Sequence, residues 1–380
     1  MLHNPQKDFL RRHIGPSKED QSKMLKTLNY LSLDDLIANT VPEKIHYKGQ
    51  LNIGESNSEY EALRKLKGIS KKNKIFSNFI GMGYYGTYTP YVILRNILEN
   101  PGWYTSYTPY QPEVAQGRLE MLLNFQQMIV DFTGMDIANA SLLDEGTAAA
   151  EAMGLSHRLN KKESNLVFVS ENCHPQTIDV IQTRAEPMGL KVLVGDETKV
   201  LNQLKEDLVC GILQYPGTLG DIKDPSEAIS KIHKRNGKSI LVSDLLALAL
   251  LKTPRELGAD IAVGSSQRFG IPMGYGGPHA AFFATKDEYK RSMPGRIVGV
   301  SVDRHGNKAY RLSLQTREQH IRRDKATSNI CTAQALLAIV SAAYAIYHGP
   351  NGIRNISERV SQLAKNFAEY LMPFDRNKGE

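Results

Sequence analysis

The pattern of hydrophobic and polar positions changes near residue 75. Before that point, apolar residues recur at helical spacing, and Ser17, Ser32 and Ser58 each precede acidic residues of the kind that favour a first helical turn. This pattern predicts a helical N-terminal arm over residues 1–75.

From about residue 76 to 340, apolar runs of strand length alternate with amphipathic helical segments. The expected strands read NLVFVS, KVLVG, VCGILQYP, KSILVSD, ADIAVGS and HAAFFAT. Such alternation predicts a large α/β domain whose mostly parallel sheet is covered by helices on both faces. A long helical stretch follows, and we expect residues 341–380 to start a small C-terminal domain, either truncated or abbreviated.

The composition narrows the class of protein. The 380 residues exceed the size of one core and are 41% hydrophobic and 23% charged, as in an ordinary soluble protein. The run ALLAIVSAAYAIY is too short to span a bilayer, and the N-terminus lacks an apolar leader, so we expect a cytoplasmic protein without a membrane partner. The net charge of +7 is dispersed, which argues against nucleic acid, and three scattered cysteines indicate no metal site.

Polar residues directly after the expected strands are the candidates for a ligand pocket, because ligands bind beyond the carboxyl ends of parallel strands. His174, Asp244, Gln267 and Arg268 occupy such positions. Pyridoxal-phosphate (PLP) enzymes use an aspartate to hold the pyridinium nitrogen, a stacked ring, and a lysine some tens of residues after the aspartate. Asp244 and His174 suit the first two roles, but Gln267 stands 23 residues after Asp244, where a lysine is expected.

Each candidate also has a purely structural interpretation. Asp244 can cap the helix that follows it, and His174 can be a strand-end residue with a satisfied hydrogen bond. Gln267 and Arg268 can form an exposed polar pair, and the glycines of GIPMGYGG can serve only tight turns.

Several long runs carry a resemblance to a known family. They are FLRRHIGPS at 9–17, FIGMGYYGTYTP at 79–90, ILRNILENPGWYTSYTPYQPEVAQGRLEMLLNFQ at 93–126, IANASLLDEGTAAAEAM at 137–153, CHPQT at 173–177, GSSQRFGIPMGYGGPHAAFFA at 264–284 and DKATSNICTAQALLA at 324–338. Over nearly its whole length the sequence resembles the glycine cleavage system P-proteins, the PLP-dependent glycine decarboxylases. The resemblance implies a fold-type I PLP-transferase domain, similar to aspartate aminotransferase.

That family is built of two similar halves, and this chain resembles the first half, whereas the Schiff-base lysine belongs to the second. The resemblance therefore implies no catalytic residue here, with Gln267 at the lysine position and PLP held covalently by the partner half. It also implies the reaction: glycine loses carbon dioxide, and its aminomethyl group passes to the oxidised lipoyl arm of the H-protein. Tyr84, Tyr85 and Tyr88 are candidates to contact substrate, or equally to pack an interface.

Two other hypotheses belong to different classes. The chain could be a scaffold or pseudoenzyme that only binds partners, or a truncated inactive fragment. It could also be an active PLP enzyme that uses another lysine, for which Lys252 and Lys286 are the nearest to the loop. A neighbouring gene with a lysine in the equivalent loop would distinguish the first hypothesis from these.

Overall fold

The computed structural model describes residues 13–105, 109, 111–161, 164–274, 277, 279–314, 319–326 and 334–375. The chain divides into two units, Met1–Ser77 and Asn78–Glu380, and each is described by itself. A separate small domain over residues 341–380 stays a prediction.

The first unit consists of short, capped helices. They are α2 (Lys18–Thr27), α3 (Leu33–Thr40), the 3₁₀ turn η1 (Glu43–Ile45) and α4 (Glu59–Ser70). Ser17, Ser32 and Ser58 each accept a hydrogen bond from the backbone N–H of the third helical residue, which confirms the three predicted caps. None of residues 13–77 is buried, so within this unit the apolar side chains have no core to join.

The second unit is built on a seven-stranded sheet with the order β1-β7-β6-β5-β4-β2-β3. The neighbours from β3 through β6 pair in parallel, whereas β7 is antiparallel to β6 and to β1. The predicted, mostly parallel sheet is therefore confirmed. Its strands are β1 (Ile137–Ala138), β2 (Leu166–Ser170), β3 (Lys191–Gly195), β4 (Cys210–Tyr215), β5 (Lys238–Ser243), β6 (Ile261–Ser265) and β7 (Ala281–Thr285).

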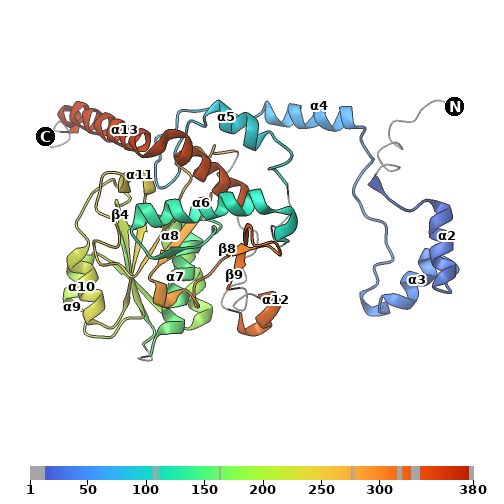
Figure 1. Ribbon diagram of the computed structural model, residues 1–380, viewed down its shortest axis with the longest axis horizontal. Helices are drawn as coiled ribbons and strands as arrows, with labels where there is room; N and C mark the ends of the chain where they lie inside the picture. The colour runs from blue at the N-terminus through green and yellow to red at the C-terminus, as the bar shows by residue number, and fades with distance from the viewer. Residues whose placement is uncertain are drawn as a thin grey trace. The chain divides into compact units, whose positions relative to one another are not determined.

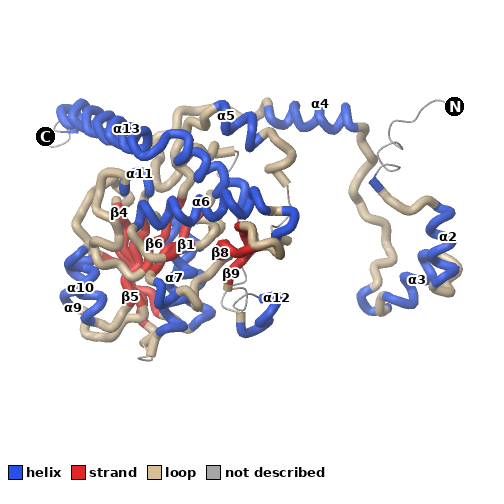
Figure 2. The backbone as a smooth tube through the Cα atoms, viewed as in Figure 1, coloured by secondary structure: helices blue, strands red, loops and turns tan. Residues whose placement is uncertain are grey.

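Helices cover the sheet on both faces (Figures 1 and 2). Because side chains alternate along a strand, Ile240 and Val242 of β5 join one hydrophobic core while Leu241 joins the other. The first core includes residues of α7 (Glu145–Leu159) and α8 (Pro175–Ala185), and the second includes residues of α6 (Gln116–Thr133), α10 (Ser226–Lys234), α11 (Leu245–Leu248) and α13 (Ala335–Asp375).

Smaller elements complete this unit. They are α5 (Tyr91–Ile93), the π turn η2 (Leu94–Leu98), α9 (Glu197–Gln203), α12 (Gln319–Arg322), and the 3₁₀ turns η3 (Pro112–Val114), η4 (Glu186–Met188), η5 (Asp287–Tyr289) and η7 (Arg323–Lys325). A hairpin of β8 (Ile297–Val302) and β9 (Lys308–Ser313) was not anticipated from the sequence. The long helical stretch expected near the C-terminus forms α13, which is interrupted at Gly349, with φ 63° and ψ 177°.

Candidate functional site

A pocket of about 420 Å³ opens where the parallel strands end. Its walls come from the segments after β2, β4, β5 and β6, from the start of α7, and from α13. His174, Asp244, Gln267 and Arg268, which the sequence singled out separately, all line this one pocket. The volume lies within the range of small-molecule sites, roughly 300 to 1,000 Å³.

Gln267 is fully buried beyond the end of β6. Its side-chain Nε2 donates to the backbone oxygens of Tyr85 and Ile271, at 2.8 Å each, and its Oε1 lies 3.4 Å from the backbone nitrogen of Tyr85. An amide can donate and accept in this way, whereas a lysine ammonium has no acceptor. The interpretation of Gln267 and Arg268 as an exposed polar pair is therefore wrong.

Asp244 makes two interactions at once. Its Oδ1 accepts from the backbone N–H of Leu246 at 2.9 Å and so caps α11, while its Oδ2 forms an ion pair with Nη1 of Arg268. The Arg268 guanidinium lies under the Tyr85 ring, 4.4 Å from the ring centroid. Asp244 thus caps α11 and also lines the pocket.

His174 and Glu145 lie side by side deeper in the pocket. Nδ1 of His174 is 2.8 Å from Oγ1 of Thr218, and its Nε2 is 3.8 Å from Oε1 of Glu145. Burial, reinforced by the charge of Asp244, raises the pKa of Glu145 to about 8, and burial lowers the pKa of His174. At neutral pH the carboxyl and the imidazole are therefore both mainly uncharged.

Sequence reasoning missed Glu145, although a signal was present. Asp144 and Glu145 precede GTAAAEAM at the predicted start of a helix, where one carboxylate suffices as a cap. Asp144 takes that role, accepting from the backbone N–H of Thr147 at 2.7 Å, and the second acid turns into the pocket.

The structure separates the three candidate tyrosines. Tyr85 lines the main pocket, and Tyr84 packs edge-on against His279 beside a smaller cavity at the start of α7. Tyr88 is 74% exposed and meets only the ring of Tyr91 among the described aromatic contacts. Tyr85 alone of the three faces the polar cluster of Asp244 and Arg268.

A family model described as glycine cleavage system P-protein matches residues 11–377. The chain belongs to the glycine cleavage system P-protein family. It is 82% identical to the glycine dehydrogenase (decarboxylating) of Pelagibacter ubique (strain HTCC1062) over 98% of its own length, and 59% identical to that of Nostoc sp. (strain PCC 7120) over 94%. The resemblance seen in the sequence is confirmed.

The chain spans only about two fifths of the length of these relatives, 39% and 36% respectively. A crystal structure of glycine decarboxylase (P-protein) in inhibitor-bound form matches with a TM-score of 0.81 at 36% identity, over 90% of this chain and 78% of that one. A sphingosine-1-phosphate lyase from Burkholderia pseudomallei, with a TM-score of 0.57 at 12% identity over 83% of this chain and 75% of that one, shares the fold alone. The expected fold class, fold-type I PLP-dependent, is confirmed.

The residues of this pocket do not fit PLP. Gln267, which stands where the resemblance implies a cofactor lysine, is a hydrogen-bonded amide, and both oxygens of Asp244 are already engaged by Leu246 and Arg268. A helix N-terminus of this fold suits a phosphate, but here the N-terminus of α7 is capped by the Asp144 carboxylate of the same chain. The mismatch is chemical, because the volume alone would admit a small molecule.

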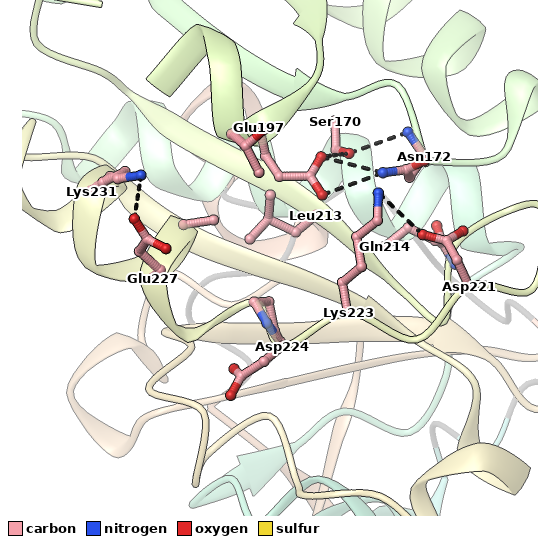
Figure 3. A pocket seen from close by; sticks show the side chains of 13 residues that line it. Ser170, Asn172, Glu197, Leu213, Gln214, Asp221, Lys223, Asp224, Glu227 and Lys231 are labelled. Carbon is pink, nitrogen blue, oxygen red and sulfur yellow. Dashed lines mark hydrogen bonds and ion pairs between the residues drawn. The ribbon is translucent and has the colours of Figure 1, made fainter. Parts of the chain in front are cut away.

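A second pocket, of about 80 Å³, lies near the start of α9 (Figure 3). Its central carboxylate, Glu197, accepts from Ser170 Oγ at 2.7 Å and lies 3.3 Å from Nδ2 of Asn172, while Lys223 pairs with Asp221 at 3.3 Å. The contacts of Glu197 link the end of β2 to α9, and Lys223 and Asp221 neutralise each other. Among the described residues, no set of three His, Cys, Asp or Glu side chains is grouped to hold a metal ion, and no helix is long and apolar enough to cross a membrane.

Proposed function

We propose that this chain is the lysine-free part of a glycine decarboxylase. It works with a second, lysine-bearing part that binds PLP covalently, releases carbon dioxide from glycine and passes the aminomethyl group to the lipoyl arm of an H-protein. The observation that carries this proposal is the buried, hydrogen-bonded Gln267 at the end of β6 in a member of this family.

The contribution of this chain is structural. The segment around Tyr85 is fixed to the loop after β6 by Gln267 and by Thr87 and Thr89, whose hydroxyls donate to Ile271 and Gly270 at 2.8 and 2.6 Å. A wall held this firmly can position groups across an interface without reorganisation. Tyr84 and Tyr85 are the residues we assign to that wall.

Exposed apolar side chains that follow this segment in the chain, and others on α13, support docking of the second part. Tyr88 and Tyr91 are each 74% exposed, and Ile346 and Tyr347 of α13 are about 60% exposed. The sequence predicts that the apolar helix 332–347 and the tyrosine-rich region 84–110 meet a partner. The earlier part of that helix packs instead on the core of this chain, where Ala338, Ile339, Val340 and Ala342 are buried. Residues 106–108, 110, 332 and 333 of the expected interface lie outside the described residues.

Assembly can be measured by light scattering of this chain with and without the lysine-bearing part. We expect a shift to a larger species on mixing, because docking would cover a large exposed apolar surface. Substituting Tyr347→Asp should weaken the association, whereas Val300→Asp, equally exposed but on β8, should leave it unchanged. Absence of any mixed species would contradict both this proposal and the scaffold hypothesis.

The activity test is exchange of labelled bicarbonate into glycine in the presence of lipoylated H-protein. We expect exchange when both parts are present and none with this chain alone. Full exchange by the lysine-bearing part alone, unaltered by this chain, would refute the proposal. Association without any increase in exchange would favour the scaffold.

A further inference from the structure

The environment of Arg268 matches that of a bound pyridinium ring in three respects. The guanidinium is a planar, delocalised cation; a carboxylate, Asp244, lies at its edge; and an aromatic ring, Tyr85, lies over its face at 4.4 Å. Cofactor rings in this fold are likewise held by an aspartate at the ring nitrogen and by a stacked ring. The side chains of Arg268 and Asp244 are only 21% and 20% exposed, so the pair lies mainly within the pocket wall.

We propose that Arg268 is a built-in occupant of the cofactor-ring position and that it closes this pocket to PLP. The Asp244 carboxylate would otherwise be a largely buried, unpaired anion facing a pocket of about 420 Å³. Arg268 supplies the cation that the cofactor supplies in a lysine-bearing pocket, so the charge of Asp244 is balanced without the cofactor.

Gln267 and Arg268 act together in this arrangement. Gln267 bridges to the backbone of Tyr85 through both ends of its amide, and this contact holds the Tyr85 ring above the Arg268 guanidinium. A lysine at the same place could not accept from the Tyr85 N–H. Gln267, which stands in place of a Schiff-base lysine, therefore also positions the Tyr85 ring over the Arg268 guanidinium.

The consequence is that cofactor is directed to one pocket of the assembled enzyme. Without Arg268, the pocket would still present a free carboxylate below an aromatic ring, which is a weak site for any planar organic cation. This inference concerns only the pocket of this chain, so its failure would leave the glycine decarboxylase proposal standing.

Chemical rescue tests the proposal. Arg268→Ala should lower the melting temperature of the chain by about 4 to 8 °C, because it leaves the Asp244 charge unpaired in a mainly buried site. Methylguanidinium in excess of its dissociation constant should restore a measurable part of this loss by occupying the vacated site, and the same concentration of trimethylammonium, which is not planar, should restore much less. Arg255→Ala is the matched control, because Arg255 and Asp136 form a comparable pair at 3.4 Å that is about 40% exposed on each side.

The double variant Arg268→Ala, Asp244→Asn should show no rescue, because the carboxylate that selects the cation is gone. Rescue that persists in this double variant, or equal rescue by both cations, would overturn the proposal. So would an Arg268→Ala chain as stable as the unaltered one.

If Arg268→Ala fails to fold, fluorescence titration of the unaltered chain with pyridoxamine phosphate still shows whether the pocket admits a cofactor ring. We expect no saturable binding up to millimolar concentration. Saturable binding that Asp244→Asn abolishes would show that the ring position is open, contrary to the proposal.

Discussion

Replacing Glu145 by glutamine should stabilise this chain increasingly as the pH rises. The carboxyl faces the pocket beside His174, and burial with the nearby charge of Asp244 raises its pKa from 4.5 to about 8. The folded state therefore keeps a proton that the unfolded state releases above pH 4.5, so wild-type stability falls as pH rises from about 4.5 to 8. An amide has the same shape and no charge to protonate.

The magnitude follows from the shift in pKa. Keeping the carboxyl protonated costs the folded chain about 3 kcal/mol at pH 7, because that pH lies about 2.5 units above the unfolded pKa of 4.5. Above pH 8 the cost reaches about 5 kcal/mol. Because water reaches 14% of the side chain, both figures are upper bounds. At pH 5 the Glu145→Gln variant and the wild type should agree to within about 1 kcal/mol, since glutamine retains an acceptor for Thr177 Oγ1.

Urea unfolding at pH 5, 7 and 8.5 measures this difference. The control is Glu227→Gln, which removes an exposed glutamate paired with Lys231 and should show a small difference that does not grow between pH 6 and 8.5. A Glu145→Gln variant that gains no stability with rising pH would show that Glu145 is ionised in the folded chain, and the reasoning would be refuted.

Two further variants probe the fold and the pocket. Asp260→Asn should cost about 3 to 5 kcal/mol of unfolding free energy in urea, because the buried carboxylate accepts from His233 at 2.8 Å and pairs with Lys286. Burial opposes the Asp260 charge, but the bonds from His233 and Lys286 outweigh it and lower the Asp260 pKa. The stabilisation from the Asp260 charge should be complete above the unfolded pKa of 3.8 and should be lost only in acid. An Asp260→Asn variant that costs as much at pH 3 as at pH 7 would contradict this expectation. Gln267→Lys should yield no bicarbonate exchange when the second part is absent, since it breaks two bonds to Tyr85 and sets an amine beside Arg268; measurable exchange would mean that the pocket is one substitution from activity.

Much of the fold could be predicted because it depends on local pattern. The strands β2 to β7 are continuous apolar runs, and the caps Ser17, Ser32 and Ser58 are local signals. The β8–β9 hairpin was missed although apolar residues alternate on both sides of DRHGN, because only a third of its strand positions are buried and the apolar runs are weak. The run VILRNILEN has the amphipathic pattern of a helix, but a π turn follows Ile93, a change that local propensity does not encode.

The site could be predicted only in part. The rule that ligands bind at strand ends correctly placed His174, Asp244 and Gln267 at the carboxyl ends of the parallel strands. It could not show that Arg268 turns inward to pair with Asp244, nor that Glu145 points into the pocket, because both depend on side-chain direction at loop and helix ends. Tyr84, Tyr85 and Tyr88 were grouped by sequence proximity, yet the backbone turns them towards different neighbours.

The central claim is that this chain does not bind PLP covalently, and reductive labelling tests it most directly. The chain and the lysine-bearing part, alone and mixed, are incubated with PLP, reduced with borohydride, digested and mapped by mass spectrometry. We predict a stoichiometric pyridoxyl-lysine on the lysine-bearing part and no specific adduct on this chain in any mixture. A stoichiometric adduct on one peptide of this chain, at Lys252 or Lys286 for example, would contradict the account.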